Sequence, residues 1–115
     1  MTPAELEDLS RAAAAKLPPE FAAHLWPSCV NDEPSGIWTN GTYDDMWLHE
    51  STEACAEIMV RVLWPKGWLP VGHEIGCYVL NEGFLPTGIA VRYKEIEGGP
   101  MLVFRVAVLR AVVAL

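Results

Sequence analysis

The most informative segment of this sequence for its fold is GPMLVFRVAVLRAVVAL, residues 99–115. Gly99-Pro100 is typical of a helix start, and nearly all of the residues that follow are apolar. Residues 101–115 are too few to cross a bilayer, which takes roughly twenty residues. Arg105 and Arg110 also make insertion into lipid unfavourable. We therefore expect a buried helix and no membrane partner.

The small residues of this segment lie on one side of a helical wheel. Ala107, Ala111 and Ala114 recur at intervals of four and three residues, and Arg105 and Arg110 bound the opposite side. Small side chains allow a helix to approach another layer closely. The pattern predicts a closing helix that packs on a sheet.

Two further helices are predicted from their end signals. Thr2-Pro3-Ala4-Glu5 combines a capping residue, a proline at the first helical position and a carboxylate three residues after the cap, so a helix should run to about Lys16. Ser51 or Thr52 is expected to cap a second helix, which Pro65 and then Gly67 end.

The period of the apolar residues changes to two between Trp68 and Ile96, as is typical of strands. We expect strands at residues 76–80 and 89–96, with turns at residues 81–83 and 86–88. Upstream, Asn40-Gly41 favours a tight hairpin turn. Residues 1–115 are thus predicted to form one α+β domain, in which a small antiparallel sheet of three to five strands packs with about three main helices in αβ or αβα layers.

Charge is unevenly distributed along the chain, whose formal net charge is −7. No lysine or arginine occurs between Leu17 and Val60, and this segment contains more than half of the acidic residues. Phosphate binding requires cations, so we expect no direct contact with nucleic acid. An acidic surface suits a protein partner, in particular a basic one.

The N-terminus and the cysteines indicate the compartment. The first residues are acidic and amphipathic, and they lack the basic and then apolar pattern of a signal peptide. Cys29, Cys55 and Cys77 are odd in number and show no paired spacing, so each is expected to be a reduced, structural thiol. Both observations favour a cytoplasmic location.

Two segments, residues 51–63 and 100–115, carry a family resemblance. They contain a capped helix start, a Gly-Trp pair and a final helix with Pro-(four residues)-Arg-x-Ala. The matching residues are Ser51, Thr52, Glu53, Ala56, Gly67, Trp68, Pro100, Arg105 and Ala107. About half of the chain thus resembles the phage ABA sandwich proteins, small domains of phages and prophages. The resemblance implies a layered α/β fold and an accessory role, and it brings no catalytic residues.

Candidate catalytic and metal-binding residues do not form a complete set. His49 and Glu53 lie one helical turn apart with Cys55 nearby, but the metalloprotease pattern requires a second histidine four residues from the first. His73 and Cys77 are four residues apart near a strand, and a metal would need further ligands. We therefore expect no metal site, no cofactor and no catalytic residues.

Aromatic and acidic side chains gather around the predicted hairpin. A short hairpin offers little to bury its aromatic rings, and exposed rings beside acids are typical of a protein-binding surface. At least one of the two tryptophans in this region is expected to close the core. The predicted binding patch consists of Trp38, Tyr43, Asp44, Asp45, Trp47, His49, Glu50 and Glu53.

These features predict a small phage or prophage accessory protein without catalytic activity, which binds another macromolecule through the acidic and aromatic patch. A homodimer is left open. One alternative is an acidic inhibitor that mimics nucleic acid, or an immunity-type protein, that blocks a basic nucleic-acid enzyme. The other alternative is a small metal-dependent or hydrolytic enzyme.

Overall fold

The computed structural model describes residues 1–27, 34–39 and 45–115 of the chain. The main elements are α1 (Pro3–Lys16), β1 (Leu25–Pro27), β2 (Pro34–Trp38), β3 (Met46–Trp47), α2 (Thr52–Ile58), β4 (Leu69–His73), β5 (Gly76–Leu80), β6 (Pro86–Arg92) and α3 (Gly99–Ala114). Short 3-10 turns occupy Pro19–His24, Leu48–Glu50 and Tyr93–Glu95.

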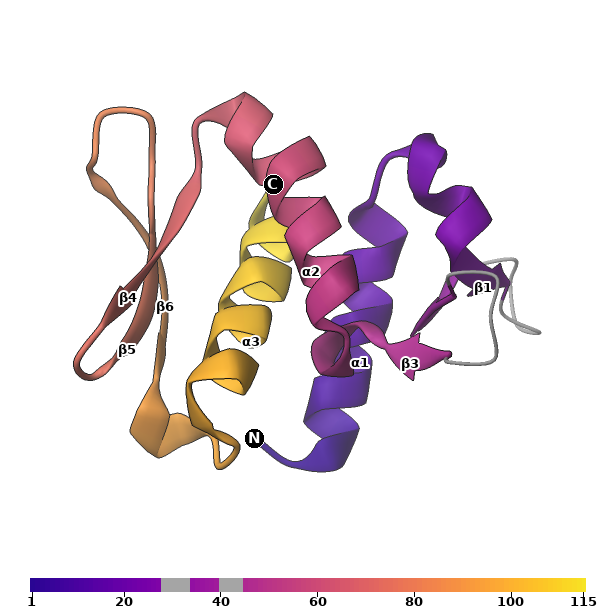
Figure 1. Ribbon diagram of the computed structural model, residues 1–115, viewed down its shortest axis with the longest axis horizontal. Coiled ribbons are helices and arrows are strands. Elements are labelled where there is room, and N and C mark those ends of the chain that lie inside the picture. The colour runs from indigo at the N-terminus through magenta and orange to yellow at the C-terminus, as the bar shows by residue number, and fades with distance from the viewer. Residues whose placement is uncertain (28–33, 40–44) are drawn as a thin grey trace.

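The elements are stacked in layers, with α3 in the middle (Figure 1). The sheet β4-β5-β6 packs on one side of α3, and α1 and α2 lie on the other side. The second sheet, β1-β2-β3, packs on α1 at the opposite end of the molecule. Both sheets are antiparallel and three-stranded. The chain therefore has the predicted α+β fold class, with its strands divided between two small sheets.

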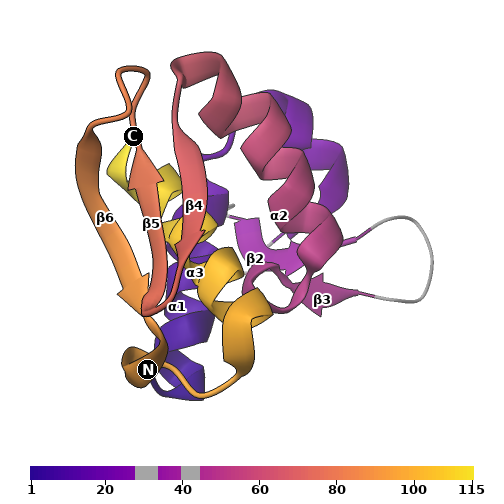
Figure 2. The ribbon, with the colours of Figure 1, turned by 60° about the vertical axis from the view of Figure 1, so that its left-hand side comes forward.

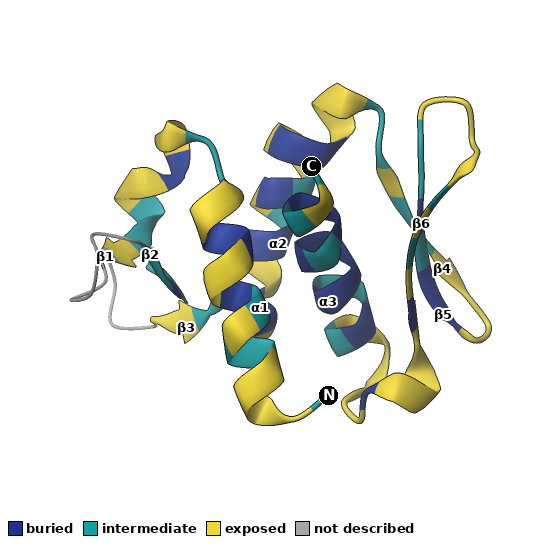
Figure 3. Ribbon diagram, turned by 180° about the vertical axis from the view of Figure 1, so that it is seen from behind, coloured by how far each residue is buried: buried dark blue, intermediate teal, exposed yellow. Residues whose placement is uncertain are grey.

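Helix α3 is buried on both sides (Figure 3). Toward the sheet, Val103, Val106 and Ala107 pack in one cluster with Cys77 and Val91. Toward the other helices, a second cluster joins buried side chains of α1, α2 and α3. A helix that is apolar nearly all round its circumference needs cover on more than one side. The predicted closing helix on a sheet is thus confirmed, and it is also the centre of the molecule.

Helix α1 begins with the predicted capping box. The Glu5 backbone N–H donates to Thr2 Oγ1 at 3.2 Å, and the Thr2 N–H donates to Glu5 Oε1 at 3.1 Å. Strand β2 crosses this helix so closely that a Cβ at Gly36 would lie 2.8 Å from the Arg11 backbone nitrogen. Gly36 therefore allows the sheet β1-β2-β3 to rest directly on the α1 backbone.

Helix α2 is capped by Ser51, whose Oγ accepts from the Ala54 N–H at 3.1 Å. The chain stays helical beyond α2, through a π-helical turn at Met59–Leu63 and a 3-10 turn at Trp64–Lys66. It ends at Gly67, whose φ of +77° suits glycine. The sequence thus located both ends of this helical segment.

The strands differ from their predicted bounds in two places. Strand β5 is as predicted, but β6 already begins at Pro86, inside the predicted turn, and it ends at Arg92 rather than at residue 96. In the upstream hairpin, Trp38 pairs with Met46. A two-residue turn at Asn40-Gly41 would instead pair Trp38 with residue 43, so the hairpin connection is longer than predicted; its central residues lie outside the described part.

Candidate functional site

Trp38, the first residue of the predicted patch, belongs to the core. Its side chain is only 3% exposed and stacks on the His24 ring, with the ring centroids 4.7 Å apart. The expectation that one tryptophan of this region closes the core is confirmed. Trp38 is therefore removed from the predicted binding patch, because a buried ring cannot contact a partner.

His49 is also buried, which corrects a second member of the patch. Its backbone N–H donates to Ser10 Oγ at 3.1 Å, and its Nδ1 lies 2.9 Å from the same oxygen. Burial lowers the pKa of His49 from its ordinary value, although the neighbouring Glu50 carboxylate acts in the opposite direction. His49 thus fastens the turn before α2 to the middle of α1.

The remaining members of the predicted patch have varied positions. Asp45, Glu50 and Glu53 are exposed. Trp47 is half-buried, and the Arg11 guanidinium lies over its ring at 4.9 Å from the centroid. Tyr43 and Asp44 lie outside the described residues. What is left of the patch is a group of exposed carboxylates beside a partly covered indole.

Ser10, His49 and Glu50 have the residue types of a hydrolytic triad, and the Glu50 carboxylate lies 3.6 Å from His49 Nε2. A nucleophile must be reachable by its substrate. Ser10 is completely buried, with 0% of its surface exposed, and its oxygen already bonds to two groups of the same histidine. This cluster is built for packing rather than for attack on a substrate.

Arg105, which the sequence places on the polar side of the closing helix, extends the same network. Its Nε donates to the His49 carbonyl oxygen at 2.8 Å, and its Nη1 donates to Thr52 Oγ1 at 3.0 Å. The guanidinium therefore ties α3 to the turn before α2 and to the first turn of α2. This contact joins residues 51–63 and 100–115, the two segments on which the resemblance was noted.

The thiols of Cys55 and Cys77 are buried. Burial raises the pKa of Cys55 to about 12 and raises that of Cys77 above its ordinary value. A thiol is nucleophilic as its thiolate, so both groups are poor nucleophiles at neutral pH. This agrees with the predicted structural role of these two cysteines, whereas Cys29 lies outside the described residues.

The outer face of the β4-β5-β6 sheet is uncovered, because the α-helices all lie on its inner side (Figures 1 and 2). Cys77 and Val91 are paired across β5 and β6, and both point inward and are buried. One residue along, Val71, Tyr78 and Ala90 are paired across the three strands. Because side chains alternate along a strand, these three point outward.

Large apolar side chains are exposed in the two turns at the ends of this sheet. Ile75, in the turn between β4 and β5, is 59% exposed. Phe84 and Leu85, in the turn between β5 and β6, are 76% and 62% exposed. Phe84 also has a φ of +59°, which costs energy in a residue other than glycine. We call the outward residues Val71, Tyr78 and Ala90, together with the exposed turn residues Ile75, Phe84 and Leu85 at the two ends of the sheet, the open face.

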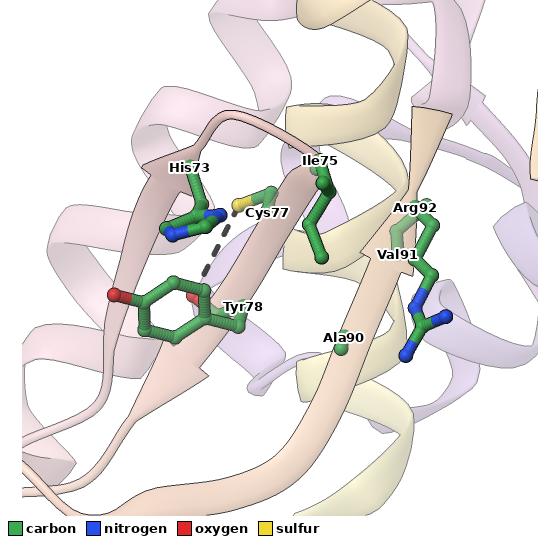
Figure 4. A pocket seen from close by; sticks show the side chains of 8 residues that line it. His73, Ile75, Cys77, Tyr78, Ala90, Val91 and Arg92 are labelled. Carbon is green, nitrogen blue, oxygen red and sulfur yellow. Dashed lines mark hydrogen bonds between the residues drawn. The ribbon is translucent and has the colours of Figure 1, made fainter. Parts of the chain in front are cut away.

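A shallow groove of about 330 Å³ lies at the Ile75 end of the open face (Figure 4). The rings of His73 and Tyr78, whose centroids are 6.0 Å apart, lie on one side of the groove, and Arg92 lies on the other. Ala90 lies between them and leaves room because its side chain is short. A second groove of similar volume adjoins the first, shares Ile75 and Arg92 with it, and is bordered by Lys94.

No prediction from the sequence included the open face. The pattern that could have found it is apolar residues inside turn sequences, namely Ile75 in HEIG at residues 73–76 and Phe84-Leu85 in NEGFLP at residues 81–86. A turn usually exposes its side chains, so a large apolar residue in a turn indicates exposed hydrophobic surface, which is typical of an interaction site.

Comparison with known proteins found no family model, no curated protein and no solved structure that matches the chain. Within the described ranges, no helix is long and apolar enough to traverse a membrane. In the same part of the chain, no three or more His, Cys, Asp and Glu side chains gather so that they could hold a metal ion.

Proposed function

We propose that this chain is a small, non-catalytic binding protein that docks another protein on its open face. The observation that carries the proposal is the uncovered sheet face with Ile75, Phe84 and Leu85 exposed at its ends. Single exposed apolar residues are ordinary, but a group of them on one uncovered face is typical of an interaction surface.

The chemistry of the buried polar groups supports a role without catalysis. Ser10 beside His49 is out of reach of any substrate, and the pKa of Cys55, at about 12, keeps its thiol protonated. The groove on the open face is shallow, whereas most small-molecule active sites enclose their ligands more fully. A protein surface fits such a shape better than a small substrate does.

The biological setting of this proposal comes from the sequence. The resemblance to the phage ABA sandwich proteins supports an accessory role in a phage or prophage, and the N-terminal sequence supports a cytoplasmic location. Both belong to the proposal and are independent of the open face.

Peptide selection tests the proposed docking surface directly. A random peptide library displayed on phage is selected against the full chain, and the affinities of the enriched peptides are measured for variants of the open face. Ile75→Asp and Leu85→Asp should each weaken binding by about tenfold or more, because a buried apolar contact is replaced by a charge.

Met46→Asp is the matched control for these variants. Met46 is 44% exposed in β3, at the other end of the molecule, so the same change of charge and polarity should leave peptide affinity unchanged. Circular dichroism and urea unfolding establish that each variant is folded. If no peptide is enriched, or if Met46→Asp weakens binding as much as the two open-face variants, the proposed function is wrong.

A second candidate is capture of a basic partner by the acidic surface, as predicted from the sequence. The observation that favours it is the exposure of Asp45, Glu50 and Glu53 near the start of α2. Glu50→Lys with Glu53→Lys should then abolish binding of lysine-rich peptides and spare peptides that bind the open face. Retained binding of the lysine-rich peptides by this double variant removes the candidate.

The acidic surface is less suited to mimicry of nucleic acid. Such mimicry needs a continuous row of free carboxylates spaced like phosphates. Within the described residues the row is interrupted, because Asp8 pairs with Arg11 at 2.9 Å and Glu57 pairs with Arg61 at 3.3 Å.

A further inference from the structure

We infer that the groove of the open face selects partner segments that carry carboxylates next to large apolar side chains, with Arg92 and Lys94 binding the carboxylates. This inference rests on the proposed function, because it names the chemical class of the protein segment that the open face takes. Three independent features of the groove lead to it.

The first feature is a pair of cations that lack an acidic partner. The other four arginines are engaged: Arg11, Arg61 and Arg110 form ion pairs with Asp8, Glu57 and Glu95, and Arg105 donates to His49 and Thr52. Arg92 and Lys94 form no ion pair with any residue that the structure describes. Lys16 and Lys66 also form no ion pair with a described residue, but they border neither groove, so Arg92 and Lys94 are the unpaired cations of the open face.

Glu95 is the acid one would expect to neutralise them, and it is otherwise engaged. Its Oε2 accepts from the Arg92 backbone N–H at 2.6 Å, and its Oε1 lies 3.8 Å from Arg110 Nη1. The carboxylate therefore caps the Tyr93–Glu95 turn and pairs with α3. The guanidinium of Arg92 stays available to an acid from outside the chain.

The second feature is the apolar lining between these cations. Ile75 and Arg92 border both grooves, and Tyr78 and His73 form the far wall of the first groove (Figure 4). A partner side chain that lies over Ala90 would contact the Tyr78 ring and Ile75. A carboxylate on an adjacent partner residue would then reach Arg92, and one farther along would reach Lys94.

The third feature is the shape of the groove floor. A Cβ at Gly76 would collide with the Val91 carbonyl oxygen, so β5 and β6 approach closely there and cannot carry a larger residue at position 76. Ala90, which is paired with Tyr78 on the same outward side, has a short and exposed side chain. The groove is therefore open because Gly76 on β5 and Ala90 on β6 are both small residues.

The charges around the grooves favour an acidic segment over a basic one. Glu74 is the one carboxylate among the described residues that line the two grooves, whereas Glu95 and Glu97 lie with Lys94 around a separate hollow beside α1. Among the described residues, most of the acidic side chains belong to the helical half of the molecule. An acidic segment would be attracted to the grooves and repelled by the other surfaces, which gives specificity as well as affinity.

Three synthetic nine-residue peptides test the inference. They share the same leucine and phenylalanine positions and differ only in having Glu, Gln or Lys at the alternate positions. Binding to the full chain is measured by fluorescence anisotropy of the labelled peptides. We expect the Glu peptide to bind most tightly, and we expect its binding alone to weaken when salt is raised from 50 to 500 mM, because salt screens exposed charge pairs.

Two sets of variants locate the effect. Arg92→Gln with Lys94→Gln should weaken binding of the Glu peptide by about fourfold to twenty-fivefold, at about twofold to fivefold for each exposed ion pair, and leave the Gln peptide unchanged. Lys16→Gln with Lys66→Gln removes the same charge elsewhere and should have little effect. Ala90→Leu fills the groove without a change in charge and should weaken both peptides.

The outcomes separate the inference from the proposed function. If the Glu peptide fails to bind at millimolar concentration, or binds no better than the Lys and Gln peptides, the inference is wrong. The open face still stands as a docking surface in that case, provided that library-selected peptides lose affinity with Ile75→Asp. If Lys16→Gln with Lys66→Gln weakens the Glu peptide as much as the groove variant does, net charge explains the binding and the inference is overturned.

Discussion

Removal of the Ser10 hydroxyl should destabilise the protein by several times more than removal of an ordinary surface hydroxyl. In Ser10→Ala, the His49 backbone N–H and the His49 Nδ1 both lose their partner, since each bonds to Ser10 Oγ. A buried polar group without a partner costs about 1–3 kcal/mol. Two such groups cost about 2–6 kcal/mol, and the better helix propensity of alanine returns about 0.5 kcal/mol.

The expected loss in the free energy of unfolding is therefore about 2–5 kcal/mol, measured by urea unfolding at pH 7.5 with tryptophan fluorescence and circular dichroism. Ser35→Ala is the comparison. Ser35 Oγ donates to the Trp26 carbonyl oxygen at 3.0 Å, but this contact is exposed and water can replace it. Ser35→Ala should cost less than about 1 kcal/mol. Equal losses for the two variants would refute the claim that Ser10 and His49 form a buried structural link.

Three further predictions follow from the same core. Burial lowers the pKa of His49, so below about pH 6.5 the unfolded state takes up a proton that the folded state does not. The free energy of unfolding should therefore fall as pH drops from about 6.5 toward the pKa of the folded state. This dependence on pH, measured by urea unfolding, should be weaker in His49→Gln. Gly36→Ala should lower stability by about 1–3 kcal/mol in urea unfolding, since its φ is +86° and the added Cβ meets the Arg11 backbone, and a neutral effect would contradict the close contact of β2 with α1. Iodoacetamide at pH 8 should modify Cys55 only after unfolding, because the pKa of this thiol is about 12 in the folded protein; mass spectrometry of the Cys55 peptide tests this, and modification of the folded chain would count against it.

The helices were predictable because their signals are local. The capping box from Thr2 to Glu5, the Ser51 cap and the stop at Gly67 each depend on residues within one turn of one another. The role of the closing helix also followed from its own composition, since a helix that is apolar nearly all round must be buried. Its central position, with the sheet on one side and the other two helices on the other, went beyond the predicted contact with a sheet, because the composition of one helix does not show which elements cover its second side.

The predicted start of strand β6 was wrong because pairing with β5, and not the local sequence, makes residues 86–88 a strand. Pro86-Thr87-Gly88 has a composition typical of a turn. In the structure, Pro86 pairs with Leu80, and Thr87 Oγ1 donates to the Val79 carbonyl oxygen at 2.7 Å. A proline at the first residue of an edge strand leaves no ladder hydrogen bond missing, so the neighbouring strand can accept it.

The binding patch was predicted in part from residues whose burial depends on distant segments. His49 is covered because Ser10, 39 residues earlier, reaches its ring and its backbone. Trp38 is covered because His24 and Phe21 pack on its ring. Local sequence shows only that these residues lie near a cap and in a hairpin, and both settings usually expose side chains. Burial of this kind can be read only once the packing of α1 on the second sheet is known.

The division of charge between the two halves of the molecule explains how the chain can carry an uncovered apolar face. Exposed apolar surface promotes self-association, and a net charge far from zero opposes it. Here the acidic excess lies on the helical half, whereas the β4-β5-β6 sheet presents Ile75, Phe84 and Leu85. Two copies that meet through their open faces would bring Arg92 and Lys94 of both chains near the same interface, which disfavours a parallel face-to-face dimer. The acidic helical half thus opposes self-association through net charge, and Arg92 and Lys94 oppose direct pairing of two open faces while they would attract an acidic partner.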